Sequence, residues 1–173
     1  GLHALQHRGQ EASGIICFDP KIQEFRAHHG FGLVGDTFSD PHTMEKLQGT
    51  CAIGHNRYGT SGPSLLRNVQ PIFAEFVFGG LAVAHNGNLT NARALRRNLI
   101  QRGCLFQSTM DTEVFVHLIA TSLYTTVEDK LIDALKRVMG AYSLVVLSQN
   151  ALIGARDPFG IRPLVLGRLP TKQ

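Results

Sequence analysis

Short runs of apolar and β-branched residues alternate along the chain with glycine, proline and polar turn signals. Such runs predict β-strands, and a pair joined by a two-residue turn predicts a hairpin. One hairpin is expected across Gly79-Gly80, and the last three runs are expected to form a meander. The runs are 13–18, 25–28, 51–54, 72–78, 81–84, 142–148, 151–155 and 163–166. Between the second and third of them, Gly30, Gly32 and Gly35 are expected to permit tight bends.

Elsewhere the apolar residues recur at helical spacing. A helix already under way at the first residue is expected to end near Arg8-Gly9, and Asp40-Pro41 opens a short helix that ends near Gly49. Three helices are expected in the middle of the chain, the first two beginning after a capping residue. Their limits are Thr90 to Gly103, Asp111 to Ser122, and 127–139. Strands, then helices, then strands predict an α+β fold in which helices cover sheets.

The composition is that of one ordinary globular domain. Of the 173 residues, 43% are hydrophobic and 17% are charged, which is far from the composition of disordered chains. The three cysteines are too few and too widely spaced for a disulfide framework, so a reducing cytoplasm is expected. Cys17, Cys51 and Cys104 lie in β-like runs and are interpreted as small buried side chains rather than nucleophiles. No signal peptide is expected, and no apolar run approaches the ~20 residues of a membrane span.

The net charge of +4 leaves a nucleic-acid-binding module open as an alternative. However, the densest basic stretch, Arg93, Arg96, Arg97 and Arg102, lies on a predicted helix whose wet face most of these arginines would coat. No aromatic residues are interleaved with them for base stacking. The histidines show no metal-ligand spacing with a carboxylate partner, so no metal site is expected. Neither nucleic acid nor membrane is predicted as a partner.

Three segments carry candidate chemistry, and each has a purely structural interpretation beside it. Asn86-Gly87 is a common tight-turn signal, yet an asparagine amide and a glycine N–H can also form an oxyanion hole. Arg57 ends a predicted strand, with Thr60 on the loop that follows, and an arginine there can pair with a carboxylate or remain exposed. Asp111 can cap a helix or receive an ammonium group.

The two outermost motifs are interpreted as turns. Arg8-Gly9 lies between a helix and a strand, and the closing segment 155–164 has the proline and glycine placement of turns. Ion pairs that involve Arg8, or Arg156, Asp157 and Arg162, are the expected means of holding them.

Taken in order, the motifs LQHRGQE, GHNRYGTSG, LRNVQP, AHNGNLTNA, STMDTEV and ARDPFGIRPL resemble the glutaminase domain of the amidophosphoribosyltransferases, which are N-terminal-nucleophile hydrolases. The resemblance runs from Leu5 to Gly167. It implies a four-layer αββα sandwich, with two antiparallel sheets between helices. Gly59 and Met110 depart from the family's usual residues, but neither position carries an assigned role.

The resemblance also implies roles for individual residues. Arg57 and Thr60 would bind the α-carboxylate of L-glutamine, and Asp111 would bind its α-ammonium group. Asn86 and Gly87 would form the oxyanion hole. Arg8 and Gly9 would position the loop that carries the nucleophile, which in the family is an N-terminal cysteine.

By the same resemblance, residues 1–173 form a glutaminase domain without that cysteine, so the chain as given is expected to be inactive. Ammonia would pass to a C-terminal phosphoribosyltransferase domain for purine synthesis, and the protein would form a homo-oligomer. No cofactor is expected in this chain, whereas Mg²⁺ is expected with the other domain and an iron–sulfur cluster is possible in the full protein. A degenerate binding or scaffold domain, and another class II amidotransferase, remain alternatives.

Overall fold

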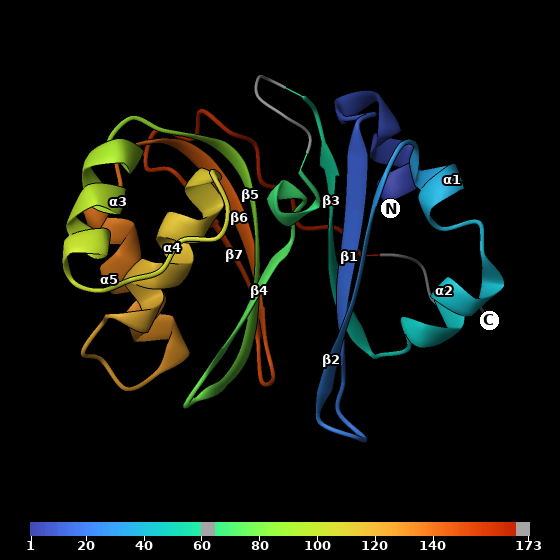
Figure 1. Ribbon diagram of the computed structural model, residues 1–173, viewed down its shortest axis with the longest axis horizontal. Helices are drawn as coiled ribbons and strands as arrows, with labels where there is room; N and C mark the ends of the chain where they lie inside the picture. Colours follow the sequence, from blue (N-terminus) through green and yellow to red (C-terminus); the bar gives the residue numbers. More distant parts are fainter. Residues whose placement is uncertain (60–64, 169–173) are drawn as a thin grey trace.

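The computed structural model describes residues 1–59 and 65–168, and it contains two antiparallel sheets packed face to face (Figure 1). The first has the strand order β2-β1-β3, and the second has the order β4-β5-β6-β7. The first is built from β1 (Ala12–Asp19), β2 (Glu24–Phe31) and β3 (Cys51–Arg57). The second is built from β4 (Ile72–Phe76), β5 (Gly79–Leu89), β6 (Gly140–Ser148) and β7 (Leu152–Arg156).

Helices cover the outer face of each sheet. The second sheet is covered by α3 (Ala92–Gln101), α4 (Asp111–Ala120) and α5 (Val127–Arg137) (Figure 1). Beside the first sheet lie the 3₁₀-helix η1 (Leu2–Arg8) and the short helices α1 (Val34–Thr37) and α2 (Pro41–Lys46). A second 3₁₀-helix, η2 (Leu66–Asn68), leads into β4. The expected α+β class and four-layer sandwich are therefore confirmed.

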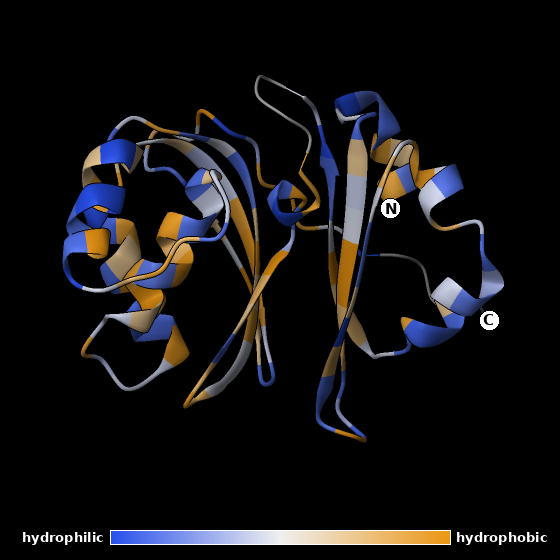
Figure 2. Cartoon of the chain, in the orientation of Figure 1, coloured by the Kyte–Doolittle hydropathy of each residue, from blue (hydrophilic) through white to orange (hydrophobic). Residues whose placement is uncertain are grey.

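The alternation of side chains along β5 divides the core into two parts. Leu81 and Val83 belong to the cluster packed beneath α3, α4 and α5, whereas Ala82 and Ala84 belong to the cluster between the sheets. Both faces of this strand are therefore apolar, which explains its nearly continuous hydrophobic run. Figure 2 shows hydrophobic colour along the strands in the middle of the molecule.

Several expected boundaries differ from the structure. The hairpin between β4 and β5 turns at residues 77–78, and Gly79, with φ 107°, already begins β5. Gly30 lies inside β2 and Gly35 inside α1, so of the three glycines named only Gly32, with φ 96°, occupies a bend. Residues 163–166 form no strand, and β7 is the edge of its sheet within the described residues.

The predicted helix caps and one cysteine also need correction. The N-cap of α3 is Asn91 rather than Thr90, and the N-cap of α4 is Met110, so Asp111 is the first residue inside α4. Cys17 is buried in β1, as expected, and Cys51 begins β3 but is only partly buried. Cys104 is also partly buried, and it follows α3 outside any strand.

Asp157 organises the closing segment through backbone contacts rather than through the expected ion pairs. Its side chain is only 1% exposed, and its carboxylate accepts the N–H groups of four residues. The donors are Tyr142 at 3.3 Å and Phe159, Ile161 and Arg162 at 3.1 Å each. Burial raises the pKa of this carboxyl, but the backbone hydrogen bonds outweigh burial and hold the pKa below its ordinary value.

We expect Asp157→Asn to lower the melting temperature at neutral pH, because an amide cannot accept four N–H groups as a carboxylate does. The folded-state pKa lies below the unfolded one, so this stabilisation is present above the ordinary Asp pKa and is lost on acidification through the folded pKa. Thermal melts at neutral and acidic pH should therefore show a difference between wild type and variant that shrinks in acid. Asp36→Asn, at an exposed position of α1, is the control, and an equal loss in that variant would contradict the role of Asp157.

Candidate functional site

Asn86-Gly87 lies inside β5 and does not form the tight turn that its sequence also allowed. Asn86 pairs with Ser143 of β6, and Gly87 pairs with Tyr142. Gly87 has φ 154°, and a Cβ there would collide with the Ala141 carbonyl oxygen and lie 2.8 Å from the Cα of Tyr142. Glycine is therefore required because β6 approaches the backbone closely at this point.

The direction of the Gly87 N–H follows from its neighbours. The His85 N–H donates to Gln70 Oε1 at 2.7 Å, and Gln70 Nε2 donates to the His85 carbonyl at 3.1 Å. Two residues beyond Gly87, the Leu89 N–H donates to Asp111 Oδ2 at 3.0 Å. Since alternate residues of a strand direct their backbone groups to the same side, the Gly87 N–H points to this edge as well.

The contacts of β6 indicate the same direction for the Gly87 N–H. The backbone of Tyr142, the partner of Gly87, is directed toward Asp157: its carbonyl accepts the Asp157 N–H at 2.8 Å, and its N–H donates to the Asp157 side chain. Gly87 and Tyr142 are therefore a non-hydrogen-bonded pair. The Gly87 N–H lies on a strand edge that β4 no longer covers, between two N–H groups satisfied by side chains.

Asn86 and Arg57 lie on the faces that the two sheets turn toward each other. On β5, the side chain of Asn86 points to the same face as those of Ala82 and Ala84, which belong to the core between the sheets. Asn86 itself is exposed, beyond the end of this core. On β3, Arg57 shares the face of Ile53, which lies in the same core between the sheets. The asparagine amide and the guanidinium therefore point into the same space between the sheets.

Arg57 is buried yet incompletely paired. Its side chain is 9% exposed, and its Nε lies 3.7 Å from Glu11 Oε2, while its carbonyl accepts the Glu11 N–H at 3.2 Å. The Nη1 atom of Arg57 is buried and has no hydrogen-bond partner within residues 1–59 and 65–168. A buried guanidinium nitrogen without an acceptor is a favourable place for an anionic ligand.

The two residues assigned to nucleophile positioning occupy different environments. Gly9 is buried against Arg57, and a Cβ at Gly9 would lie 2.6 Å from the Arg57 carbonyl oxygen. Arg8 has an exposed side chain at the end of η1. Thr60 lies outside the described residues.

Asp111 approaches β5 from the helical layer. At the first position of α4 its carboxylate lies at the positive end of the helix dipole, and it holds the edge of β5 through the bond to Leu89. Asp111 also lines a pocket of about 530 Å³ beside this edge. The other lining residues are Asn88, Leu89, Thr90, Ala92, Arg93, Arg96 and Thr109. Asp111 therefore meets β5 from the helical layer, whereas Arg57 belongs to the facing sheet, and neither Arg57 nor Asn86-Gly87 is among the residues that line this pocket.

Two histidines, the buried His85 and the partly buried His55, adjoin this segment without adding charge. The pKa of His85 is lowered to about 4 by burial and by its neighbours His55 and Arg162. The pKa of His55 is lowered to about 4 by burial, against a hydrogen bond to the His85 backbone, and Arg57 lowers it further. Both rings are therefore neutral at neutral pH. The positive charge at this end of β3 comes from Arg57.

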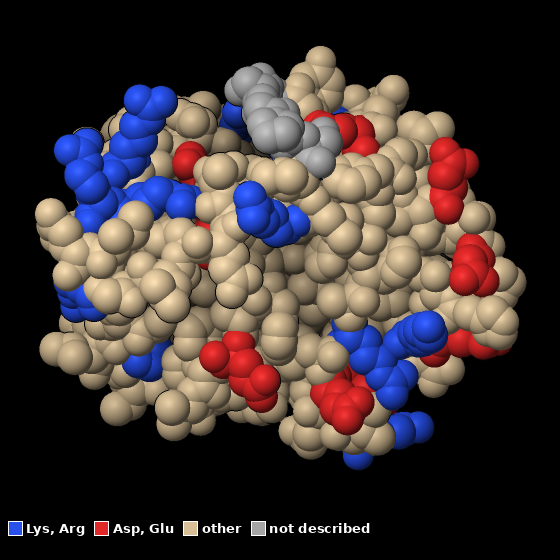
Figure 3. All heavy atoms as spheres, viewed as in Figure 1, with Lys and Arg blue, Asp and Glu red and all other residues tan. Residues whose placement is uncertain are grey.

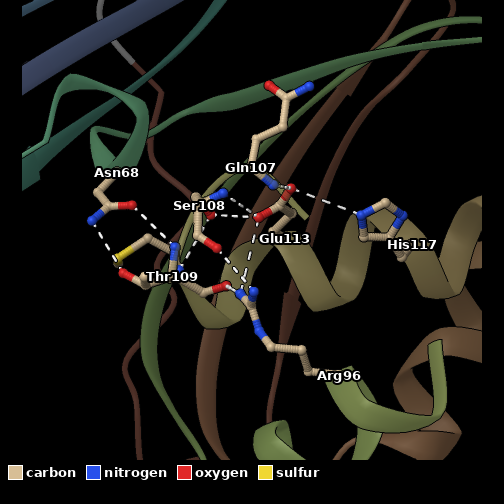
Figure 4. A network of polar contacts seen from close by, with 8 residues as sticks. Asn68, Arg96, Gln107, Ser108, Thr109, Glu113 and His117 are labelled. Atoms are coloured by element: carbon tan, nitrogen blue, oxygen red, sulfur yellow. Dashed lines mark hydrogen bonds and ion pairs between the residues drawn. The ribbon is translucent and has the colours of Figure 1, made fainter. Parts of the chain in front are cut away.

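A polar network that was not predicted from the sequence holds the segment before Asp111 (Figure 4). Glu113 of α4, buried with 6% exposure, accepts hydrogen bonds from Gln107 and Ser108. Arg96 of α3 donates to backbone carbonyls of the same segment, so it does not merely coat the wet face. The available signal was the capping-box spacing, because Glu113 stands three residues after the N-cap Met110.

Figure 3 shows Lys and Arg side chains gathered over α3, where Arg93, Arg97 and Arg102 are exposed. Within the described parts of the chain, no group of three or more His, Cys, Asp or Glu side chains is arranged to hold a metal ion. Among the helices of residues 1–59 and 65–168, none combines the length and the apolar character that crossing a membrane requires.

Comparison with known proteins identifies the family. A family model described as a glutamine amidotransferase domain matches residues 55–173. An amidophosphoribosyltransferase of Rhizobium etli is 53% identical over 172 residues, which are 99% of this chain and 34% of that protein. A chloroplastic amidophosphoribosyltransferase of Vigna aconitifolia is 51% identical over 96% of this chain and 34% of its own length.

A solved structure agrees with these relatives. The glutamine phosphoribosylpyrophosphate amidotransferase of B. subtilis, complexed with ADP and GMP, superposes with a TM-score of 0.90 at 41% identity. The match covers 98% of this chain and 36% of that one, so the chain spans about a third of the proteins it resembles. The chain belongs to the glutamine amidotransferase domain family.

Proposed function

We propose that this domain binds L-glutamine across the Asn86-Gly87 segment and, in the longer protein, releases ammonia from the side-chain amide. The observation that carries the proposal is the uncovered N–H of Gly87 beside the exposed Asn86 amide, with a partly unpaired arginine from the facing sheet and a carboxylate from the helical layer. The free nitrogen of Arg57 would take the α-carboxylate. Asp111, which lines the pocket, would take the α-ammonium group.

This arrangement would select glutamine by its charged end. Each substrate charge would meet an opposite charge, and an amide without the α-amino or α-carboxyl group would leave a protein charge unpaired. The amide oxygen would lie at the Gly87 N–H and the Asn86 side chain. These two donors would stabilise the negative charge that develops on the oxygen during attack on the amide carbon.

The nucleophile would be an N-terminal cysteine of the longer protein, as the resemblance implies. Its thiol sulfur would attack the amide carbon, and its α-amino group would accept the thiol proton and pass it to the departing nitrogen. Ammonia would leave, and water would hydrolyse the thioester to glutamate. The ammonia would then displace pyrophosphate from phosphoribosyl pyrophosphate on a C-terminal domain to give phosphoribosylamine.

None of the three cysteines in this chain can replace that nucleophile. Cys17 lies five residues along β1 from Ala12, the partner of Arg57 in β3, which corresponds to roughly 17 Å. Cys51 begins β3, whose opposite end carries Arg57, and Cys104 packs against the core beneath the helices.

We therefore expect the 173-residue polypeptide to release no glutamate from glutamine. A glutamate-release assay on a preparation whose intact mass confirms a start at Gly1 is the measurement. Release that iodoacetamide abolishes would show that one of the internal cysteines acts as a nucleophile, and it would refute this assignment.

Two substitutions in the full-length protein separate the proposed roles. Asn86→Ala should lower kcat for glutamine hydrolysis about 10²- to 10³-fold with little change in KM, because the oxyanion develops only in the transition state. Asp111→Asn should mainly raise KM, because the ammonium group is bound both before and during reaction. Steady-state glutaminase kinetics measure both effects.

Asn98→Ala, at an exposed position of α3, is the matched control and should behave as wild type. If wild type hydrolyses no glutamine at all, the domain is a binding module rather than an enzyme. If Asn86→Ala changes KM alone, the oxyanion role is wrong.

A further inference from the structure

Glu113 lies two residues after Asp111 in α4, and its carboxylate binds the segment that precedes Asp111. Its Oε1 accepts the Gln107 N–H at 2.7 Å, and its Oε2 accepts both the N–H and the hydroxyl of Ser108 at 2.7 Å each. In an ordinary capping box the third helical residue returns only to the N-cap. Here it reaches further back, and the Met110 N–H donates instead to the Ser108 hydroxyl at 3.2 Å.

Arg96 holds the same segment by its carbonyl groups. Its Nη1 donates to the Ser108 carbonyl at 2.9 Å, and its Nη2 donates to the Met110 carbonyl at 3.2 Å and lies 3.9 Å from Glu113 Oε2. The guanidinium also stacks 4.0 Å from the centre of the Phe106 ring. One buried charge therefore binds the N–H groups of the segment, while the opposite charge binds its carbonyls (Figure 4).

A third contact joins this segment to the other half of the site. The Thr109 N–H donates to Asn68 Oδ1, and Asn68 Nδ2 donates to the Thr109 hydroxyl, both at 3.1 Å. Two residues after Asn68, Gln70 holds the backbone of His85 beside Asn86. The segment before Asp111 and the strand that carries the oxyanion donors are therefore fixed to the same short stretch of chain.

Resting on the proposed function, we infer that Glu113 is a positioning residue that fixes Asp111 for the α-ammonium group of glutamine. The neutral amide of a glutamine at this position offers one oxygen, which cannot accept both backbone N–H groups, and its NH₂ would face a donor. Ser108 or Gln107 would then lose its partner, and Arg96 would lose its counter-charge. Residues 107–110 would then lose their fixed conformation. Asp111, which follows them directly, would no longer be held in position.

The test uses Glu113→Gln in the full-length protein. We expect KM for glutamine to rise about tenfold with a smaller change in kcat, which corresponds to weakening one charge-assisted contact by about 1.4 kcal/mol. The second probe is glutaramate, which is glutamine without its α-amino group, used as a competitive inhibitor. Its inhibition constant should stay within about twofold of wild type, because it has no group for Asp111 to bind.

The two probes separate positioning from general damage, since a distorted domain would lose affinity for both molecules equally. Equal losses, or an unchanged KM for glutamine, would overturn the inference. Glu128→Gln, at an exposed position in the first turn of α5, is the matched control and should leave both constants unchanged.

If thermal melting shows that Glu113→Gln does not fold, Ser108→Ala replaces it. This variant removes the hydrogen bond from the Ser108 hydroxyl to Glu113 and the one from the Met110 N–H to that hydroxyl, and it keeps both charges. A smaller rise in KM for glutamine is therefore expected, with no change in the inhibition constant of glutaramate. An equal effect on glutaramate would again refute the inference. A wild-type protein that hydrolyses no glutamine would instead refute the proposed function.

Discussion

The edge of β5 beyond Val83 is the feature on which the site depends. β4 pairs with β5 only as far as Val83, and a buried strand edge leaves N–H and carbonyl groups that need partners. Side chains supply them in place of a strand: Gln70 satisfies His85, and Asp111 satisfies Leu89. Gly87 lies between these two contacts, so the direction of its N–H is fixed, and no strand of the described part of the chain covers it.

The side chains that take the place of a strand at this edge also connect the layers around the site. Gln70 belongs to the segment that joins the two sheets, and Asp111 begins a helix of the outer layer. Each therefore fixes a different element against the same strand. Arg57 comes from the facing sheet, and its backbone is held by Glu11. The geometry of the site is set by contacts among four separate segments, and no single motif contains it.

The sequence predicted the fold class because it depends on local patterns and on a run of motifs, whereas the roles of the candidate residues stay predictions. Asn86-Gly87 could not be distinguished from a turn, because Asn-Gly favours turns in isolation and only the pairing with β6 keeps the strand extended. The hydrogen bond between the Gln70 side chain and the His85 backbone, fifteen residues away, was not predictable. Such a contact leaves no periodic pattern in the sequence. Glu113 lay at a recognisable spacing, but its reach past the N-cap depends on Arg96 from another helix.

The unsatisfied groups of the site are a cost that the rest of the domain offsets. A buried donor without a partner costs about 1–3 kcal/mol, and the described residues include such an atom at Arg57 Nη1. Donors that already point at a future negative charge need no reorganisation when that charge appears, so the cost in the free protein becomes an advantage in the complex. Gln70 and Asp111 bind the backbone of β5 on either side of Gly87, and these contacts fix the direction of the Gly87 N–H. The network around Glu113 and the contacts of Gln70 therefore hold the segments that adjoin this strand edge.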